Sequence, residues 1–316
     1  MKNSSEGVCM SHFPHMVFSN DGASENQYLQ LVEYIMKNGD DRGDRTGVGT
    51  RAIHGATLRF DLSDGSYPLL TTKFVPYKAV FHELNWMLSG NTNIRALLEN
   101  KVTIWSDWPY AKYLKETNDT ITMKEFEKRI VDDQQFANQW GSIGPGYGHQ
   151  WRLWQGPDGK VYDQISDLIH RIKTDPSSRR LLFHGWNVAD LDKMALPPCH
   201  LLYQFYVANG KISLTMYQRS CDVGLGLPFN IASCALLLNM VAQQCNLKVG
   251  QLFWVGHDVH LYINHLDKIA VQLERAPKAF PKLTLDPAAS LFDYKIEDVH
   301  IEGYDPHPAI RMDVAV

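Results

Sequence analysis

The fold is decided by residues 195–244, which read ALPPCHLLYQFYVANGKISLTMYQRSCDVGLGLPFNIASCALLLNMVAQQ. Two strand-like runs, 200–208 and 211–219, flank Asn209-Gly210, a dipeptide that strongly favours a β-hairpin. Residues 229–244 are almost continuously apolar, and a run of that length predicts a buried helix rather than a strand. The sequence therefore predicts a hairpin followed by a core helix.

One cysteine at the head of this hairpin is suited to be a nucleophile. Cys199 follows Pro197 and Pro198, and consecutive prolines hold the next residue extended, so the thiol stands on a stiff support. A thiolate attacks carbon, and a nearby arginine such as Arg219 is expected to lower the pKa of the cysteine. The alternative is an inert buried cysteine, which we expect for the three in apolar runs: Cys221, Cys234 and Cys245.

Composition and charge narrow the function classes. With 316 residues, no internal repeat and no visible linker, the chain is long enough for one large domain. Its five cysteines show neither a CxxC pair nor a metal-ligand spacing, which predicts a reducing, cytoplasmic compartment and no metal. No apolar run approaches membrane-spanning length. The formal charge of −4 gives no global basic field for DNA, but a local arginine cluster can hold a small anion.

Patterns elsewhere divide the chain into a leader, a domain and an insert. Residues 1–26 are polar and are expected to form a flexible leader before one folded domain, 27–316. Between about 109 and 141 the composition turns polar and charged, which predicts a helical insert on the surface rather than part of the core. Apolar periodicity predicts the remaining elements: helices over 27–36 (with Gly39 as C-cap), 78–88 and 164–173, and strands over 57–62 and 181–183.

A set of motifs runs through the chain in a characteristic order: Asp44-Arg45-Thr46-Gly47, Leu70-Thr71-Thr72-Lys73, Trp105, Tyr147-Gly148, Gln150-Trp151-Arg152, Ser178-Arg179-Arg180, Pro197-Pro198-Cys199-His200, residues 219–230, His260-Leu261-Tyr262 and Val314-Ala315-Val316. In these motifs the chain resembles the thymidylate synthase family. The resemblance runs from about Gln27 to Val316, apart from the insert. It implies an α/β (α+β) catalytic domain, with a large mixed twisted β-sheet covered by helices and one sheet face forming a homodimer interface.

The resemblance implies one-carbon transfer from 5,10-methylenetetrahydrofolate, a folate cosubstrate, to C5 of dUMP. C5 of a uracil is a poor nucleophile until something adds to C6, and the soft thiolate of Cys199 suits that addition. Glu83 lies in an apolar helix, where a carboxylate must pair, protonate or relay protons. We expect it to act as general acid and base at O4 and at the C5 proton, with Tyr147 helping through ordered water.

The phosphate dianion of the nucleotide needs several guanidinium groups. The candidates are Arg45, Arg219 and the pair Arg179-Arg180, with the hydroxyl of Ser220. Without context, an adjacent arginine pair is more often a solvated surface feature. The resemblance implies that Arg179 and Arg180 reach across a twofold interface into the partner's site, so that a homodimer is the active unit.

The base and the ribose have their own candidates. The carboxamide of Asn230 can donate to O4 and accept from N3–H of uracil, which favours dUMP over dCMP; its alternative role is the N-cap of the following helix. His260 and Tyr262 alternate on one strand face and are expected to hold the ribose 3′-hydroxyl, the alternative being an ordinary half-buried pair. Gln218 is assigned to the same substrate site.

The resemblance also implies a folate site. Trp105 is expected to stack on the folate ring and Asp222 to form a hydrogen bond with it. Lys73 and Gly226 are further candidate contacts. Ala315 and the terminal carboxylate are expected to close over the folate.

Some residues depart from the family pattern. Asn85, His184 and His257 are polar where a smaller or apolar residue is usual, which predicts a wetter pocket. Water can then capture the methylene intermediate, so hydroxymethylation of dUMP is the alternative reaction. A catalytically silent nucleotide- or RNA-binding relative is a second alternative, and the intact Cys199 and Glu83 argue against it.

Overall fold

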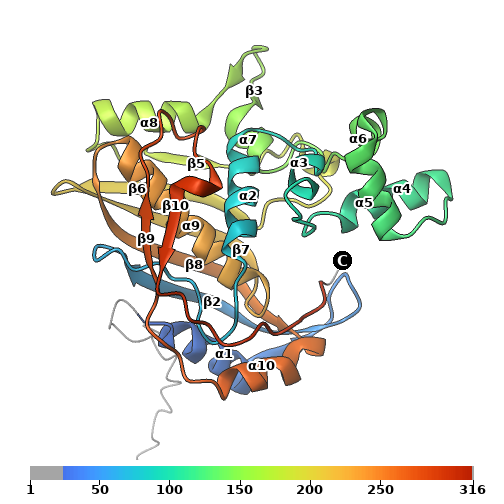
Figure 1. The fold of residues 1–316 in the computed structure, drawn as a ribbon, viewed down its shortest axis with the longest axis horizontal. Helices are drawn as coiled ribbons and strands as arrows, with labels where there is room; N and C mark the ends of the chain where they lie inside the picture. The colour runs from blue at the N-terminus through green and yellow to red at the C-terminus, as the bar shows by residue number, and fades with distance from the viewer. Residues whose placement is uncertain (1–23, 315–316) are drawn as a thin grey trace, which may run out of the picture.

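The computed structural model describes residues 24–314, and its framework is one six-stranded sheet with helices packed against it (Figure 1). The strand order is β1-β2-β8-β7-β6-β5, and every neighbouring pair is antiparallel except β7–β8, which is parallel. The sheet is therefore mixed, which confirms the predicted fold class. Its strands are β1 (Asp40–Arg42), β2 (Thr50–Asp61), β5 (Leu182–His184), β6 (His200–Ala208), β7 (Lys211–Asp222) and β8 (Lys248–Tyr262).

The predicted hairpin is confirmed as β6 and β7. Asn209 and Gly210 have φ values of 52° and 71°, so both turn residues are left-handed, as a two-residue turn between right-twisted strands requires. The chain then crosses over through α9 (Gly226–Gln244) and returns as β8, parallel to β7. Parallel neighbours need such a crossover, because a tight turn cannot join them.

Helix α9 is the core of the fold, as its apolar run predicts. It packs against β7, β8 and α2 (Tyr77–Leu88), and residues such as Leu236 and Leu238 are almost completely buried. By length and composition alone this 19-residue helix is long and apolar enough to cross a membrane, contrary to the expectation that no run approaches that length. Because 67% of its apolar window is buried inside the domain, it is better described as a core helix.

Helix α1 (Asn26–Asn38) confirms the first predicted helix, but its final glycine acts differently from a left-handed cap. Gly39 has an extended conformation, φ −71° and ψ 149°. A Cβ atom there would lie 2.7 Å from both the Ile35 carbonyl oxygen and Cγ of Arg51. Glycine is therefore needed for close approach to β2 and not for a positive φ.

The insert is helical, as predicted, with α4 (Asp107–Thr117), α5 (Met123–Asp132) and α6 (Gln134–Trp140) projecting from one side of the molecule (Figure 1). The expectation that it stays outside the core is wrong. Phe126 and Ile130 of α5 are fully buried and join the same hydrophobic cluster as the rest of the domain. Helices of this length bury an apolar stripe even when their overall composition is polar.

The remaining elements complete the covering of the sheet. The predicted helix over 164–173 is confirmed as α8, and the strand over 57–62 is the end of β2, which begins earlier at Thr50. Residues 1–23 of the expected leader and Ala315 lie outside the described residues. The other elements are α3 (Arg95–Leu98), α7 (Gly148–Arg152), β3 (Trp154–Gln155), β4 (Val161–Tyr162), α8 (Gln164–Thr174), α10 (Leu266–Leu273), β9 (Lys282–Leu285) and β10 (Val299–Glu302).

Candidate active site

Cys199 lies just before β6 and is held from both sides. Its backbone N–H donates to the hydroxyl of Tyr147 at 2.9 Å, and its carbonyl accepts from the backbone N–H of Arg219 at 2.9 Å. Its Sγ lies 3.7 Å from Nη2 of Arg219. The thiol and the guanidinium are therefore neighbours, as the sequence predicts.

The pKa of Cys199 departs from the expected direction. Burial raises the pKa of the thiol above its usual value, and Arg219 and Tyr147 lower it by less. Arg219 therefore lowers the pKa of the thiol, as expected, but burial outweighs it and the net shift is upward. Removing the sulfur from water disfavours its anion, and one guanidinium does not offset that cost.

Arg219 supports the diproline segment as well as the sulfur. Its Nε donates to the carbonyl of Pro198 at 2.8 Å, and its Nη2 donates to the carbonyl of Pro197 at 2.7 Å. Its guanidinium also lies over the ring of Trp186, 5.3 Å from the centroid. Within residues 24–314 its Nη1 has no hydrogen-bond partner, so this end of the fork can bind an anion.

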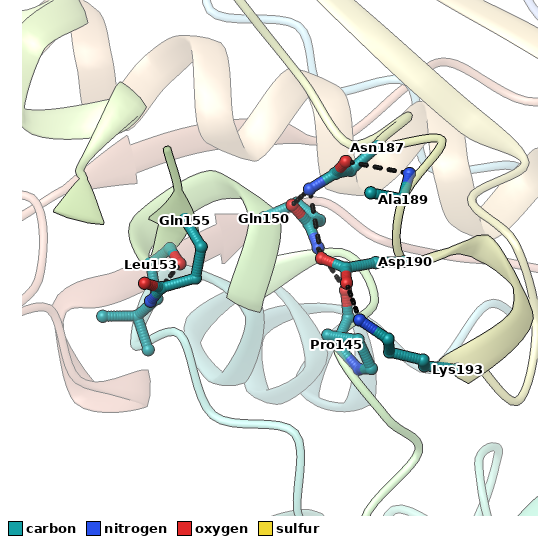
Figure 2. A network of polar contacts seen from close by, with 8 residues as sticks. All are labelled: Pro145, Gln150, Leu153, Gln155, Asn187, Ala189, Asp190 and Lys193. Atoms are coloured by element: carbon teal, nitrogen blue, oxygen red, sulfur yellow. Dashed lines mark hydrogen bonds and ion pairs between the residues drawn. The ribbon is translucent and has the colours of Figure 1, made fainter. Parts of the chain in front are cut away.

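A buried polar network, shown in Figure 2, supports the segment that leads to Cys199. Gln150 of α7 is fully buried and donates to the carbonyl of Pro145 at 2.8 Å and to Asp190 at 2.9 Å. Asn187 donates to Gln150 and to Asp190 at 3.0 Å each, and Lys193 donates to Asp190 at 2.7 Å. The network ties the loop before Tyr147 to the loop before Cys199. The Gln150 motif is visible in the sequence, but its partners are not.

Glu83 is buried in α2, with 6% of the residue exposed. Its only side-chain partner in the described part of the chain is the indole N–H of Trp105, which donates to Oε1 at 2.7 Å. Burial raises the pKa of Glu83 to about 7, and the bond from Trp105 opposes this rise. Trp105 also contacts Tyr147, with ring centroids 5.5 Å apart. A continuous set of contacts therefore joins Glu83 to Cys199.

Asn230 lies in the second turn of α9, because the helix begins at Gly226 with Leu225 as its N-cap. The N-cap alternative for Asn230 is therefore wrong. Its Oδ1 accepts from Nε2 of Gln218 at 3.0 Å, and Gln218 in turn accepts from the indole of Trp254 at 2.9 Å. Gln218 is 2% exposed, so it orients Asn230 from inside the fold. The carboxamide nitrogen of Asn230 has no partner within residues 24–314.

His260 is oriented by residues that the sequence analysis missed. Its Nδ1 lies 2.9 Å from Oδ1 of Asp258, whose Oδ2 accepts from Arg42 at 2.9 Å. An ionised carboxylate only accepts, so Nδ1 carries the hydrogen and Nε2 is left as an acceptor. The ring of Tyr262 follows on the same strand, 5.4 Å from that of His260. The alternation Asp258, His260, Tyr262 is the signal that identifies Asp258.

Asp222 ends β7 just before the loop that leads into α9, and Lys73, from the segment between β2 and α2, reaches the same loop. Lys73 is 5% exposed and donates to the carbonyl of Gly224, and burial lowers its pKa to about 8. Oδ1 of Asp222 accepts from the backbone N–H groups of Gly224 and Leu225 at 2.9 and 3.1 Å. A Cβ at Gly226 would meet its neighbours at 3.7 Å or more, so the chain itself does not require glycine there.

The candidate phosphate ligands fall into two groups. Ser220 lies on β7 beside Arg219, and Arg45 is exposed in the loop between β1 and β2. Arg179 and Arg180 are exposed before β5, with the carbonyl of Arg179 accepting from Gln204 at 3.4 Å. Gln204 is five residues after Cys199 on β6, roughly 16 Å along the strand. The fold therefore does not bring this pair to Cys199 of its own chain.

The three unusual polar residues do not gather around Glu83. Asn85 is two residues further along α2, which places it on the opposite side of the helix. His184 lies against Trp154, with ring centroids 5.1 Å apart, and His257 lies against His54 at 4.7 Å. The expectation of a wetter catalytic pocket is therefore not supported at these positions.

Among residues 24–314 no group of three or more His, Cys, Asp and Glu side chains is placed to hold a metal ion. The four described cysteines are free thiols: Cys199, Cys221, Cys234 and Cys245. A small cavity of about 190 Å³ lies at the turn end of β6 and β7, lined by Tyr206 and Lys211 among others. It contains none of the predicted site residues.

Comparison with known proteins gives the family of this chain. The sequence model of the family described as Thymidylate synthase matches residues 26–316. A thymidylate synthase of Zymomonas mobilis is 56% identical, covering 93% of this chain and 100% of the relative. Those of Rhodopseudomonas palustris and Rhizobium rhizogenes are 53% and 52% identical, each covering 92% of this chain and 99% and 98% of the relative. This chain belongs to the thymidylate synthase family.

Proposed function

We propose that the protein methylates C5 of dUMP with 5,10-methylenetetrahydrofolate, forming dTMP and dihydrofolate. The observation that carries this proposal is the set of contacts from Cys199 through Tyr147 and Trp105 to Glu83. It joins a sulfur nucleophile to a carboxyl group whose pKa is about 7. The relatives named thymidylate synthase support the same reaction.

Cys199 supplies the nucleophile. Its thiolate forms a C6–S bond, and the displaced electron pair moves toward O4, which makes C5 nucleophilic. Arg219, 3.7 Å from Sγ, stabilises the sulfur while it is negative. Folate supplies the one-carbon unit and the hydride that completes the methyl group. When the C6–S bond breaks, the electron pair returns to sulfur and the thiolate is restored.

Glu83 handles protons at the base. With a pKa of about 7, its acid and carboxylate forms are both populated at neutral pH, so it can donate toward O4 and later accept. Burial raises the pKa of Tyr147 well above its usual value, so its hydroxyl stays protonated. That hydroxyl accepts from the N–H of Cys199 and keeps its own hydrogen for a water molecule near C5.

The nucleotide fits the donors and acceptors around Cys199. The free carboxamide nitrogen of Asn230 donates to O4 of uracil, and Gln218 fixes its orientation. Nε2 of His260, left as an acceptor by Asp258, binds the ribose 3′-hydroxyl together with Tyr262. The donor from Asn230 favours uracil over cytosine. The exocyclic amine of cytosine would face the carboxamide nitrogen of Asn230, and both groups are donors.

The folate candidates are Trp105, next to Glu83, and the pair Lys73 and Asp222 at the loop before α9. The aromatic face of Trp105 suits a pteridine ring, and Oδ2 of Asp222 has no partner within residues 24–314 and suits ring N–H donors. The ammonium of Lys73, which donates to the carbonyl of Gly224 in the loop after Asp222, complements a carboxylate of the folate. Ala315 is proposed to close over it, although that residue lies outside the described part of the chain.

The active unit is proposed to be a homodimer formed on the outer face of the sheet. Tyr206 of β6 and Leu182 of β5 are 69% and 36% exposed, so this edge leaves large apolar groups uncovered. Arg179 and Arg180 lie beside them, before β5. Arg179 contacts β6 at Gln204, roughly 16 Å along the strand from Cys199, so neither guanidinium is proposed to reach Cys199 of its own chain. A second copy would receive both guanidinium groups at its phosphate site, next to Arg45, Arg219 and Ser220.

Methylation is favoured over the alternatives. The curated relatives are named thymidylate synthase, and Asn85, His184 and His257 do not surround the reacting groups, so hydroxymethylation is not favoured. Family membership indicates an enzyme rather than a silent binding protein. We place it in the cytoplasm on the strength of its free cysteines.

A product assay tests the proposal. The purified protein is mixed with dUMP and methylenetetrahydrofolate, the absorbance of dihydrofolate is followed, and the nucleotide is analysed by mass. We expect dTMP and dihydrofolate in equal amounts, and neither with Cys199→Ser. A hydroxymethyl nucleotide without dihydrofolate would overturn the assignment.

A further inference from the structure

Glu25 is a buried carboxylate that the proposed chemistry does not use. It precedes α1 and is 1% exposed. Its Oε2 accepts from the backbone N–H and the hydroxyl of Thr71 at 2.7 and 2.6 Å. Its Oε1 accepts from the backbone N–H of Thr72 at 3.0 Å and from the hydroxyl of Thr72. One dipeptide therefore saturates both carboxylate oxygens.

These bonds are what keep the charge inside the fold. Glu25 forms no ion pair within residues 24–314, and a buried carboxylate is costly unless hydrogen bonds replace its water. Bonds from N–H and O–H groups to an ionised oxygen are stronger than those between neutral groups. Glu25 thus fixes Thr71 and Thr72 more firmly than a neutral side chain would.

The same segment is fixed on its other side by the C-terminal part of the chain. The backbone N–H of His307 donates to the carbonyl of Thr71 at 2.7 Å. Arg275 donates to the carbonyls of Thr72 and Pro308 at 2.7 Å each. The hydroxyl of Tyr304 donates to the carbonyl of Leu70 at 2.9 Å. The segment 70–72 is thus held between Glu25 and the approach to the C-terminus.

Lys73 is the next residue, and its place depends on this arrangement. Its ammonium reaches the carbonyl of Gly224 in the loop that Asp222 organises. The nucleotide candidates Cys199, Asn230 and His260 make no hydrogen bond with residues 70–73 within the described chain. A shift of the segment would therefore move Lys73 directly, without breaking a hydrogen bond made by these three nucleotide candidates.

We propose that Glu25 is a positioning residue for the folate site, which sets the affinity for the folate cosubstrate by fixing Thr71, Thr72 and hence Lys73. This inference rests on the proposed function. The competing explanation is that Glu25 only anchors α1 and contributes to stability. A purely structural role would lower the amount of folded enzyme. It would not change the KM for methylenetetrahydrofolate by a larger factor than the KM for dUMP.

The test compares Glu25→Gln with Glu33→Gln, an exposed residue on the neighbouring helix α1 whose ion pair is with Lys37. The amide introduced by Glu25→Gln would place an NH2 group against N–H donors. We expect the KM for methylenetetrahydrofolate to rise about 5- to 30-fold, equivalent to about 1–2 kcal/mol, and the KM for dUMP to stay within about twofold. Glu33→Gln should change neither constant.

Thr72→Val gives a second route if Glu25→Gln folds poorly, because it removes one hydroxyl and preserves the shape of the side chain. It should raise the KM for folate in the same direction by a smaller factor. Equal changes in both constants, or no change in a folded variant, would overturn the positioning role. Failure of the wild-type enzyme to form dTMP would instead refute the proposed function, so the two failures are distinct.

Discussion

The buried carboxyl of Glu83 should cost the protein stability at alkaline pH, and replacing it should recover that stability while removing activity. Its pKa is raised from 4.5 to about 7, with burial as the main cause. The folded protein therefore binds more protons than the unfolded chain between these values. Stability is fully present below pH 4.5 and falls as the pH rises through 7.

The size of the effect follows from the shift. One pKa unit corresponds to about 1.36 kcal/mol, so the full penalty above pH 7 is about 3 kcal/mol. Between pH 5 and pH 8 the part that changes is about 2–3 kcal/mol on the same basis. Glu83→Gln cannot ionise and keeps an acceptor for Trp105, so its stability relative to wild type should rise by about that amount over this range.

Urea unfolding at pH 5 and pH 8 measures this, at one protein concentration because the enzyme is proposed to be a dimer. Other titrating groups are common to both proteins and cancel in the difference. Glu33→Gln serves as the control and should show no such trend. The reasoning fails if Glu83→Gln and wild type differ by the same free energy at both pH values. We also expect Glu83→Gln to lose nearly all turnover, since it can neither donate nor accept the proton.

Three further predictions concern the nucleotide site. Cys199→Ala should bind dUMP, measured by calorimetry, yet form no covalent adduct with 5-fluoro-dUMP and methylenetetrahydrofolate; an adduct would exclude Cys199 as the nucleophile. Asn230→Asp should shift preference from dUMP toward dCMP in competition assays, because a carboxylate accepts from the exocyclic amine, and a retained preference for dUMP would contradict the role of Asn230. Mixing Arg179→Ala with Cys199→Ala should restore part of the activity that each has lost, since one site of the mixed dimer then holds both wild-type residues, whereas no recovery would argue against sharing.

Elements with local signals could be predicted from the sequence. The turn at Asn209-Gly210 needs two left-handed residues and has them, and the apolar run of α9 can only be buried. The proximity of Cys199 and Arg219 can also be predicted from the hairpin, because a hairpin brings the start of β6 beside the end of β7. In each case residues close in sequence carry the whole of the signal.

Other parts of the site depended on contacts between distant segments. Glu25 meets Thr71 across 46 positions, and Gln150 meets Asp190 across 40, so no local pattern reveals either pair. The burial of part of the insert was also not visible in the sequence. Its overall composition is polar, and this obscures the apolar stripe, including Phe126, that packs into the core.

The sequence by itself determined which chemical groups are available: a thiol on a diproline support, a carboxyl in an apolar helix, and a carboxamide at the start of the long apolar run. Only the tertiary structure decided their protonation and orientation. The pKa of Cys199 rises although Arg219 adjoins it, and that of Glu83 rises to about 7, because burial removes water from each group. The balance between lost hydration and nearby charge exists only once the chain is folded.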